Sequence, residues 1–392
     1  MRRHSTFFAP ALAFFLLIPP MTSAAQTAPS SATSPQVEVV YVLDHNEVVT
    51  YDVDPDTGMP ARQGTLAVPP FFPTIIPSVD GHFLYVTGTE KGVYKLWAYA
   101  TDATGSPQPH PIQTLSFNKG IWNFTPNPNG GFAYAAQLVR NSQGQNVTGI
   151  RYFRIDPSTG LLTESPNVLV TYPPSGPCQS GGGGFSLLGF NPEGNQLNEV
   201  WYCSSYDTTN QYYYTRYVDQ QTGALGPDVQ TIVTGGGTIS YNLVTVTPKA
   251  IFDYYNLGFS GSTNILYVYP PRGGASPIFH CTFAMLAACS RATNPTVDPS
   301  GNYIFFYALN GTGIAKVELA QKQIVETGHS IPAGPDVMAF SPDERLIYTR
   351  NGSNPYLIGT YVFDLATGAV NPGGEISVPG SSPPSIVPAL RK

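Results

Sequence analysis

The stretch Tyr152-Phe-Arg-Ile-Asp-Pro-Ser-Thr-Gly160 decides the fold, because versions of it recur along the chain. An alternating, aromatic-rich segment leads into Asp-x-x-Thr-Gly. In this motif the Asp side chain can bond to its own backbone and the Gly can take a positive φ. The combination predicts a tight turn between two antiparallel strands. Further copies end at Gly58, Gly223 and Gly368, with a looser copy at Gly105.

A second signal precedes these turns: a turn rich in Pro, Asp and Gly, then a strand with an aromatic residue near its centre. The copies are 80–81 before Tyr85, 127–130 before Tyr134, 191–194 before Trp201, 298–301 before Phe305 and 341–343 before Tyr348. A degenerate copy at 247–248 and an opening strand at 37–42 bring the number of units to seven. The Thr-Gly turns recur about every 50 residues, a period that suits four strands in each unit.

Seven four-stranded units predict an all-β fold, a seven-bladed β-propeller with four antiparallel strands in each blade. The first unit starts at its second strand, near 39–42, and lacks an inner strand. The C-terminal stretch 383–388 matches the inner-strand stretches 72–77 and 334–339. We therefore expect the C-terminal strand to complete the first blade and close the ring, which gives a single propeller domain over 37–390.

These motifs also carry a family resemblance. The segment Tyr85-Val-Thr-Gly88 and the two kinds of turn resemble those of the YVTN/lactonase-type (6-phosphogluconolactonase-like) seven-bladed β-propeller superfamily, over essentially all of 37–390. The resemblance implies the same fold. It also implies lactonase activity, which some members have, while many others have no assigned activity. Inner strands of the enzymatic members often begin Gly-Pro-Arg-His, whereas those predicted here contain no His, so the catalytic residues remain unassigned.

Composition excludes one class of partner and explains the turns. The chain has 19 Lys and Arg against 25 Asp and Glu, and only 11% of its residues are charged. Such a chain lacks the basic surface that nucleic-acid binding requires. Its 39 Gly and 38 Pro disfavour helices, and its 24 Tyr and 21 Phe favour strands.

The N-terminus indicates export. Arg2 and Arg3 precede an apolar run at 7–18, and small residues follow at 23–25. This pattern predicts a signal peptide at 1–25, since the apolar run is too short to span a bilayer. Residues 26–36 are then a flexible leader. We expect a secreted or periplasmic protein with no membrane span in its mature chain.

Export makes disulfides the expected state of the cysteines. Sequence neighbours suggest pairing Cys178 with Cys203 and Cys281 with Cys289, although two other pairings are open. Their spacing lacks the CxxC pairs of a zinc site, so we predict no metal and no cofactor. The run Asp52, Asp54 and Asp56 has the spacing of a calcium loop, but equivalent turns keep only the middle Asp, which favours a role in the turn.

The candidate site rests on position. Propeller ligands usually meet the inner-strand ends and the loops around the central channel, where aromatic and amide side chains suit a sugar or a peptide surface. The same side chains also pack blades together. The polar or aromatic residues nearest the predicted inner-strand starts are Trp122, Asn123, Ser186, Tyr241, Arg291, Asn294 and Asp336.

Two functions remain open from the sequence. The first is a secreted lactonase-like propeller that hydrolyses a lactone or related ester at the central channel. The second is a non-catalytic module that binds a protein or glycan outside the cytoplasm. The missing histidines favour the second and the resemblance favours the first. Whether the protein is an enzyme therefore stays undecided. The expected partner is a small lactone or sugar, or an extracytoplasmic protein or glycan, and we expect a monomer.

Overall fold

A computed structural model describes most of the chain between 37 and 391. All described residues belong to one compact unit, 36–392. They form strands and turns without any helix, so none of them belongs to a helix that could cross a membrane. Within 37–391 the residues not described are 70, 141–145, 166–169, 173–182, 192, 205–208, 238–241, 256–264, 272–275, 283–294, 309–310, 333–335, 351–353, 355 and 379–384.

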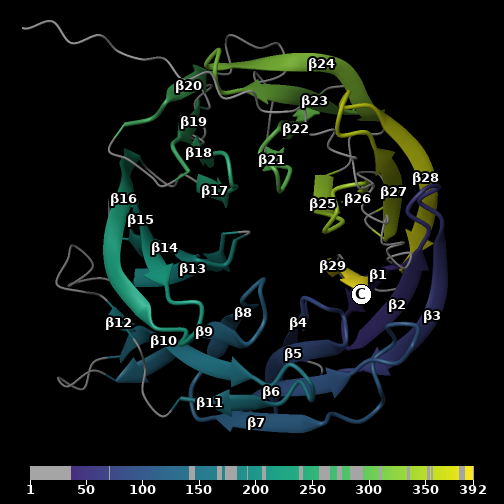
Figure 1. Ribbon diagram of the computed structural model, residues 1–392, viewed down its shortest axis with the longest axis vertical. Helices are drawn as coiled ribbons and strands as arrows, with labels where there is room; N and C mark the ends of the chain where they lie inside the picture. Colours follow the sequence, from purple (N-terminus) through teal and green to yellow (C-terminus); the bar gives the residue numbers. More distant parts are fainter. Residues whose placement is uncertain are drawn as a thin grey trace, which may run out of the picture. The chain divides into compact units, whose positions relative to one another are not determined.

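Seven antiparallel sheets surround the centre of the ring, which confirms the predicted seven-bladed propeller (Figure 1). Each blade is given from its innermost strand outward. Blade 1 contains β29 (Ser385–Arg391), β1 (Val37–Asp44), β2 (Glu47–Val53) and β3 (Pro60–Ala67). Blade 2 contains β4 (Phe71–Pro77), β5 (Phe83–Glu90), β6 (Val93–Ala100) and β7 (Gln113–Phe117). Blade 3 contains β8 (Ile121–Pro126), β9 (Phe132–Arg140), β10 (Asn146–Ile155) and β11 (Leu162–Glu164).

The remaining blades repeat this order. Blade 4 contains β13 (Gly183–Phe190), β14 (Gln196–Ser204), β15 (Thr209–Val218) and β16 (Leu225–Gly237). Blade 5 contains β17 (Asn242–Val246), β18 (Ile251–Tyr255), β19 (Ile265–Tyr269) and β20 (Phe279–Thr282). Blade 6 contains β21 (Thr296–Val297), β22 (Tyr303–Ala308), β23 (Gly311–Glu318) and β24 (Gln323–Pro332). Blade 7 contains β25 (Asp336–Phe340), β26 (Leu346–Arg350), β27 (Leu357–Phe363) and β28 (Val370–Ser377).

Blade 3 departs from four strands at its outer edge. Besides β11, the short strand β12 (Val170–Tyr172) also pairs with β10. It pairs with the first half of β10, through Thr148 and Ile150, whereas β11 pairs with the second half, through Phe153 and Ile155. The fourth position of this blade is therefore shared by two separate pieces of chain.

The ring closes as the sequence predicts. The C-terminal strand β29 pairs antiparallel with β1, with Pro388 opposite Val40 and Val387 opposite Tyr41 (Figure 1). This arrangement makes one blade from both ends of the described chain. It leaves no unpaired edge on the inner side of β1.

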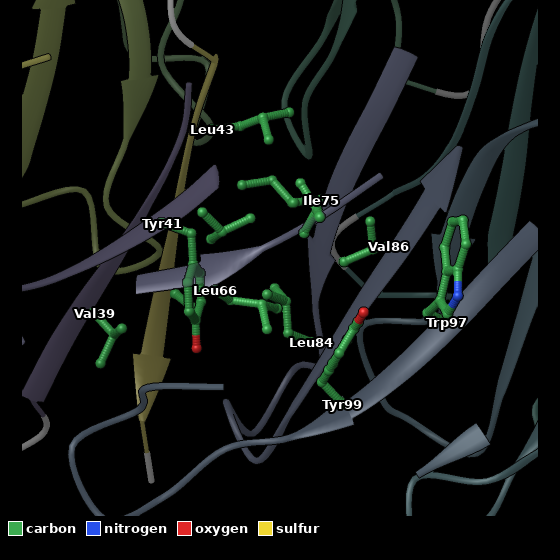
Figure 2. Close-up of a cluster of buried hydrophobic side chains, with 12 residues drawn as sticks. Val39, Tyr41, Leu43, Leu66, Ile75, Leu84, Val86, Trp97 and Tyr99 are labelled. Carbon is green, nitrogen blue, oxygen red and sulfur yellow. The ribbon is translucent and has the colours of Figure 1, made fainter. Parts of the chain in front are cut away.

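The hydrophobic core lies between blades and follows the two-residue period of the strands. On β1, Val40 and Val42 pack with blade 7, whereas Val39 and Tyr41 pack with blade 2. Figure 2 shows the second of these clusters, in which Tyr41 lies among apolar side chains of both blades. The aromatic residues predicted at strand centres are fully buried in the same way, namely Tyr85, Tyr134, Phe305 and Tyr348.

The Asp-x-x-Thr-Gly segments form the predicted turns. The Asp54 carboxylate accepts hydrogen bonds from the backbone N–H groups of Asp56 and Thr57, both at 2.9 Å. These bonds hold the pKa of Asp54 below its ordinary value. Gly58 follows with a φ of 69°. The middle Asp of the 52–56 run therefore serves the turn, as its repetition along the chain indicates.

Candidate functional site

The innermost strand of each blade carries the candidate site. These strands are β29, β4, β8, β13, β17, β21 and β25, and they lie nearest the centre of the ring (Figure 1). Because every blade has the same strand order, the first residues of these strands come to one end of the ring. The described candidates Trp122, Asn123, Ser186 and Asp336 all fall in the first half of their strands.

Four of the innermost strands are bulged near those first residues. The register with the next strand shifts between Phe71 and Thr74, Trp122 and Thr125, Phe185 and Leu187, and Val337 and Ala339. A β-bulge turns a side chain away from its regular direction and is frequent beside functional sites. The sequence repeat therefore includes an irregularity that no turn motif announces.

Asn123 is the most unusual residue of these bulges. Its φ is 51°, in the left-handed region that few residues other than Gly adopt. The Thr125 hydroxyl fixes this conformation, because it lies within hydrogen-bond distance of the carbonyl oxygens of Asn123 (3.0 Å) and of Leu188 in blade 4 (2.9 Å). No hydrogen bond of the described residues uses the half-buried Asn123 carboxamide. It is thus available to a ligand, and backbone strain of this kind often marks a functional position.

Trp122 has a packing role that competes with ligand binding. Its half-buried ring packs against the cluster between blades 3 and 4, which includes Tyr134 and Leu188. A Cβ at Gly120 would lie 3.2 Å from the ring, so Gly120 gives the indole the space it occupies. This contact supports a role of Trp122 in packing the blades together, which the sequence allows beside ligand binding.

Ser186 and Asp336 are placed by their backbones alone. Ser186 is the extra residue of the bulge in β13, a strand that packs beside β8, so the structure brings Ser186 near the strand of Asn123. Asp336 is the first residue of β25 in blade 7, the blade that packs against blade 1 on the side away from blade 2. It pairs in register with Arg350 on β26. Residues directly opposite each other in two strands share one face of the sheet. An acidic and a basic residue are therefore directly opposite each other in the strand register at the inner edge of blade 7.

The sequence did not suggest Arg350. In the repeat, Tyr348-Thr-Arg350 occupies the position of Tyr85-Val-Thr87 in blade 2, so an arginine replaces a threonine. Only the strand pairing connects this arginine with Asp336.

Three candidates and two cysteines lie outside the described residues: Tyr241, Arg291, Asn294, Cys178 and Cys289. The side chain of Cys203 is also outside the description. Cys281 is buried in the cluster between blades 5 and 6. Both disulfides therefore stay predictions. No group of three potential metal ligands occurs in the described part of the chain.

Two ion pairs of the described residues lie within single blades. Arg216 donates from Nε to Oε1 of Glu199 at 2.8 Å, and both side chains are buried in blade 4. Arg151 pairs with Glu164 in blade 3 and also donates to Gln137. Among the described residues of the innermost strands, the charged ones are Asp336 and Arg391. Asp336 is thus the one acidic residue within the described innermost strands.

Comparisons with known proteins place this architecture. No family model matches the sequence, and no curated protein matches it either. Among solved structures, 6-phosphogluconolactonase-like proteins from Bacteroides fragilis (18% identity, TM-score 0.57) and Bacteroides uniformis (16%, 0.56) cover 91% of this chain. The chain covers 99% and 100% of them, respectively. The periplasmic gluconolactonase of Pseudomonas aeruginosa is 14% identical, with a TM-score of 0.57, and the shares covered are 91% and 99%.

The fold is that of the lactonase-type propellers. At identities this low, the structural likeness establishes the fold alone. This fold agrees with the resemblance carried by the turn motifs.

Proposed function

We propose that this protein is an extracytoplasmic lactonase-type hydrolase that binds a sugar lactone at the end of the ring where the innermost strands begin. The observation that carries the proposal is the likeness to whole lactonase-like propellers, nearly all of whose length this chain covers. One of these neighbours is a periplasmic gluconolactonase. An exported protein would meet an unphosphorylated sugar lactone more readily than a cytoplasmic sugar phosphate.

Hydrolysis of a lactone needs a base that activates water and a donor that stabilises the oxyanion. We assign the base to Asp336, the acidic residue of the described innermost strands, and the oxyanion contact to Arg350, which is opposite Asp336 in the strand register. The carboxamide of Asn123 would bind hydroxyl groups of the sugar. These three roles require side chains from blades 3 and 7 to reach the same ligand.

A non-catalytic binding module is the second candidate function. The described innermost strands contain no His, and their polar residues are Trp122, Asn123 and Asn242, several Ser and Thr, Asp336 and Arg391. Such groups suit the recognition of a sugar without its hydrolysis.

An assay of glucono-δ-lactone hydrolysis separates the two functions. The acid product is detected by the protons that it releases into a weakly buffered solution. The wild-type protein should hydrolyse the lactone, and Asp336→Asn should lower kcat by about 100-fold or more. The matched control is Asp343→Asn, because Asp343 lies in the turn at the other end of β25. Urea unfolding of each variant shows whether it folds.

Three results are decisive. Equal kcat in the wild type and a folded Asp336→Asn variant would reject the assigned base. Saturable binding of the lactone without turnover would establish the binding module. If the lactone is neither hydrolysed nor bound, the proposed function is rejected.

A further inference from the structure

A cavity lies at the end of the blades where the innermost strands finish, opposite the proposed lactone site. It has a volume of about 600 Å³. Its walls come from three blades: the turn at 78–83 in blade 2, the turn at 126–131 and residues 155–157 in blade 3, and Gln220 in blade 4. Cavities that bind small ligands span roughly 300–1,000 Å³, so this one can hold a small organic molecule.

Apolar groups make up half of the wall surface. Val79, Pro126, Pro128, Ile155 and Pro157 contribute aliphatic surface. Val79 is 39% exposed although it is apolar. A ligand with a hydrocarbon segment would cover this surface and remove it from water.

The polar side chains of the lining have already committed their donor groups. Ser78 donates to Oδ1 of Asp80 at 2.6 Å, and Tyr85 donates to the carbonyl oxygen of Gly160 at 3.3 Å. Asn129 donates from Nδ2 to the carbonyl oxygen of Glu193 (2.7 Å). Its other amide hydrogen serves Gln220 Oε1 (3.1 Å), and Gln220 itself donates to the backbone of blade 4. The lining thus offers few donors to a ligand.

Acceptors remain. Oδ2 of Asp80 and Oδ1 of Asn129 take part in none of the described hydrogen bonds, and the lining contains no Lys or Arg. Burial raises the pKa of Tyr85, and the nearby negative charge of Asp80 raises it further. A cavity with spare acceptors, one carboxylate and apolar walls is complementary to an organic cation.

We propose that this cavity binds a cationic amine, either an alkylammonium or an alkylguanidinium group. The charged end donates to Asp80 Oδ2 and Asn129 Oδ1, and the hydrocarbon segment packs against Pro126, Pro128 and Pro157. This site is separate from the proposed lactone site, since Asn123 and Asp336 belong to the opposite ends of their strands. Binding therefore does not depend on lactonase activity.

The chain provides a matched control for the carboxylate. In blade 7, Ser341 donates to Asp343 Oδ1 at 2.7 Å and Asp343 accepts from the backbone N–H of Arg345 at 3.1 Å. Asp80 makes the same two contacts with Ser78 (2.6 Å) and the N–H of His82 (3.1 Å). Asp343 does not line the cavity. Replacement of either Asp by Asn keeps the Oδ1 acceptor and removes one charge, so the two variants alter equivalent turns equally.

Titration calorimetry with agmatine, a four-carbon chain with a guanidinium at one end and an ammonium at the other, tests the proposal. The wild type and Asp343→Asn should bind with the same Kd. Asp80→Asn should bind at least about tenfold more weakly, and uncharged N-butylurea should not bind. Lactone hydrolysis should be the same in all three proteins. Equal agmatine affinity in Asp80→Asn, equal losses in both variants, or no saturation at 10 mM agmatine would each overturn the proposal.

A second titration distinguishes the source of the cation. N-acetyl-arginine methylamide carries the same group on a peptide backbone. If it binds more tightly than agmatine, the cavity receives an arginine side chain of a protein. If it binds more weakly, the cavity receives a free amine.

Discussion

The hydroxyl of Tyr134 donates a hydrogen bond of 2.7 Å to the carbonyl oxygen of Gly223, across the boundary between blades 3 and 4. Equivalent tyrosines repeat the contact around the ring. They join Tyr41 to Gly105 (2.8 Å) and Tyr85 to Gly160 (3.3 Å). In blade 6 the strand centre is Phe305, and Tyr303, two residues before it, donates instead to the carbonyl oxygen of Leu365 in the next turn (2.9 Å). The two repeated sequence features, the aromatic strand centre and the Thr-Gly turn, are therefore bonded to each other between neighbouring blades.

Removal of one such hydroxyl should destabilise the ring. Tyr134→Phe keeps the buried ring but leaves the carbonyl oxygen of Gly223, also buried, without its partner. We expect a loss of about 1–2 kcal/mol in the free energy of unfolding, measured with urea. The control is Tyr217→Phe, because Tyr217 is 55% exposed. Equal stability of the two variants would mean that the contact contributes nothing.

The glycine of the same pair is needed for two reasons. Gly223 has a φ of 66°, and a Cβ there would lie 2.2 Å from Cε2 of Tyr152. Gly223→Ala should therefore destabilise the protein by about 2–4 kcal/mol, because it adds a steric clash to the backbone strain. Gly92→Ala isolates the strain, since Gly92 has a φ of 78° and nothing within 4 Å of its Cβ position. That variant should lose only about 1 kcal/mol. If both variants lose the same amount, the close packing of the turn is not the cause.

Closure of the ring by the C-terminal strand makes a third prediction. A chain that ends at 384 lacks β29, so it exposes the edge of β1 and removes Ile386 and Ala389 from the clusters on either side of blade 1. We expect this chain to lose its cooperative unfolding transition and to aggregate during gel filtration. A synthetic peptide of residues 385–391 should restore both properties. A monomeric truncated chain with unchanged stability would contradict the assigned closure.

The sequence predicts the fold well because turns carry the information. Each Asp-x-x-Thr-Gly segment specifies its own hairpin through local hydrogen bonds, such as those of Asp54, and needs no distant partner. The closing strand was also predictable, because 383–388 repeats the pattern of the other innermost strands. Local signals that recur in most of the seven blades therefore determine the architecture.

The candidate site was harder to predict because it depends on contacts between distant segments. The positive φ of Asn123 arises in a bulge held by Thr125 and the backbone of blade 4, and no local motif marks it. Arg350 enters only through its register with Asp336. The proposed amine cavity likewise combines Asp80 and Gln220, which lie in different blades. Periodicity describes what the blades share, whereas these positions depend on how the blades differ.

One of those differences lies at the boundary between blades 7 and 1. There the tyrosine of the repeat, Tyr348, donates to Oε1 of Glu38 at 2.5 Å instead of to a turn carbonyl. Glu38 is completely buried, and its Oε2 has no hydrogen-bond partner among the residues that the structure describes. Burial raises the pKa of this carboxyl to about 8, and the nearby Asp343 carboxylate adds to the effect. The group therefore holds its proton in the folded protein at neutral pH.

Glu38 should make the protein less stable as the pH rises. In the unfolded chain its carboxyl ionises near its ordinary pKa of 4.5, whereas in the folded protein it ionises only near 8. The stability it contributes is thus full below pH 4.5 and is lost as the pH rises toward 8, by up to about 5 kcal/mol. Glu38→Gln removes this titration, so its free energy of unfolding relative to the wild type should increase between pH 5 and pH 8 in urea titrations. Glu47→Gln, at an exposed position of β2, should show no such trend. A difference between wild type and Glu38→Gln that stays constant across this range would show that Glu38 is ionised in the folded protein throughout.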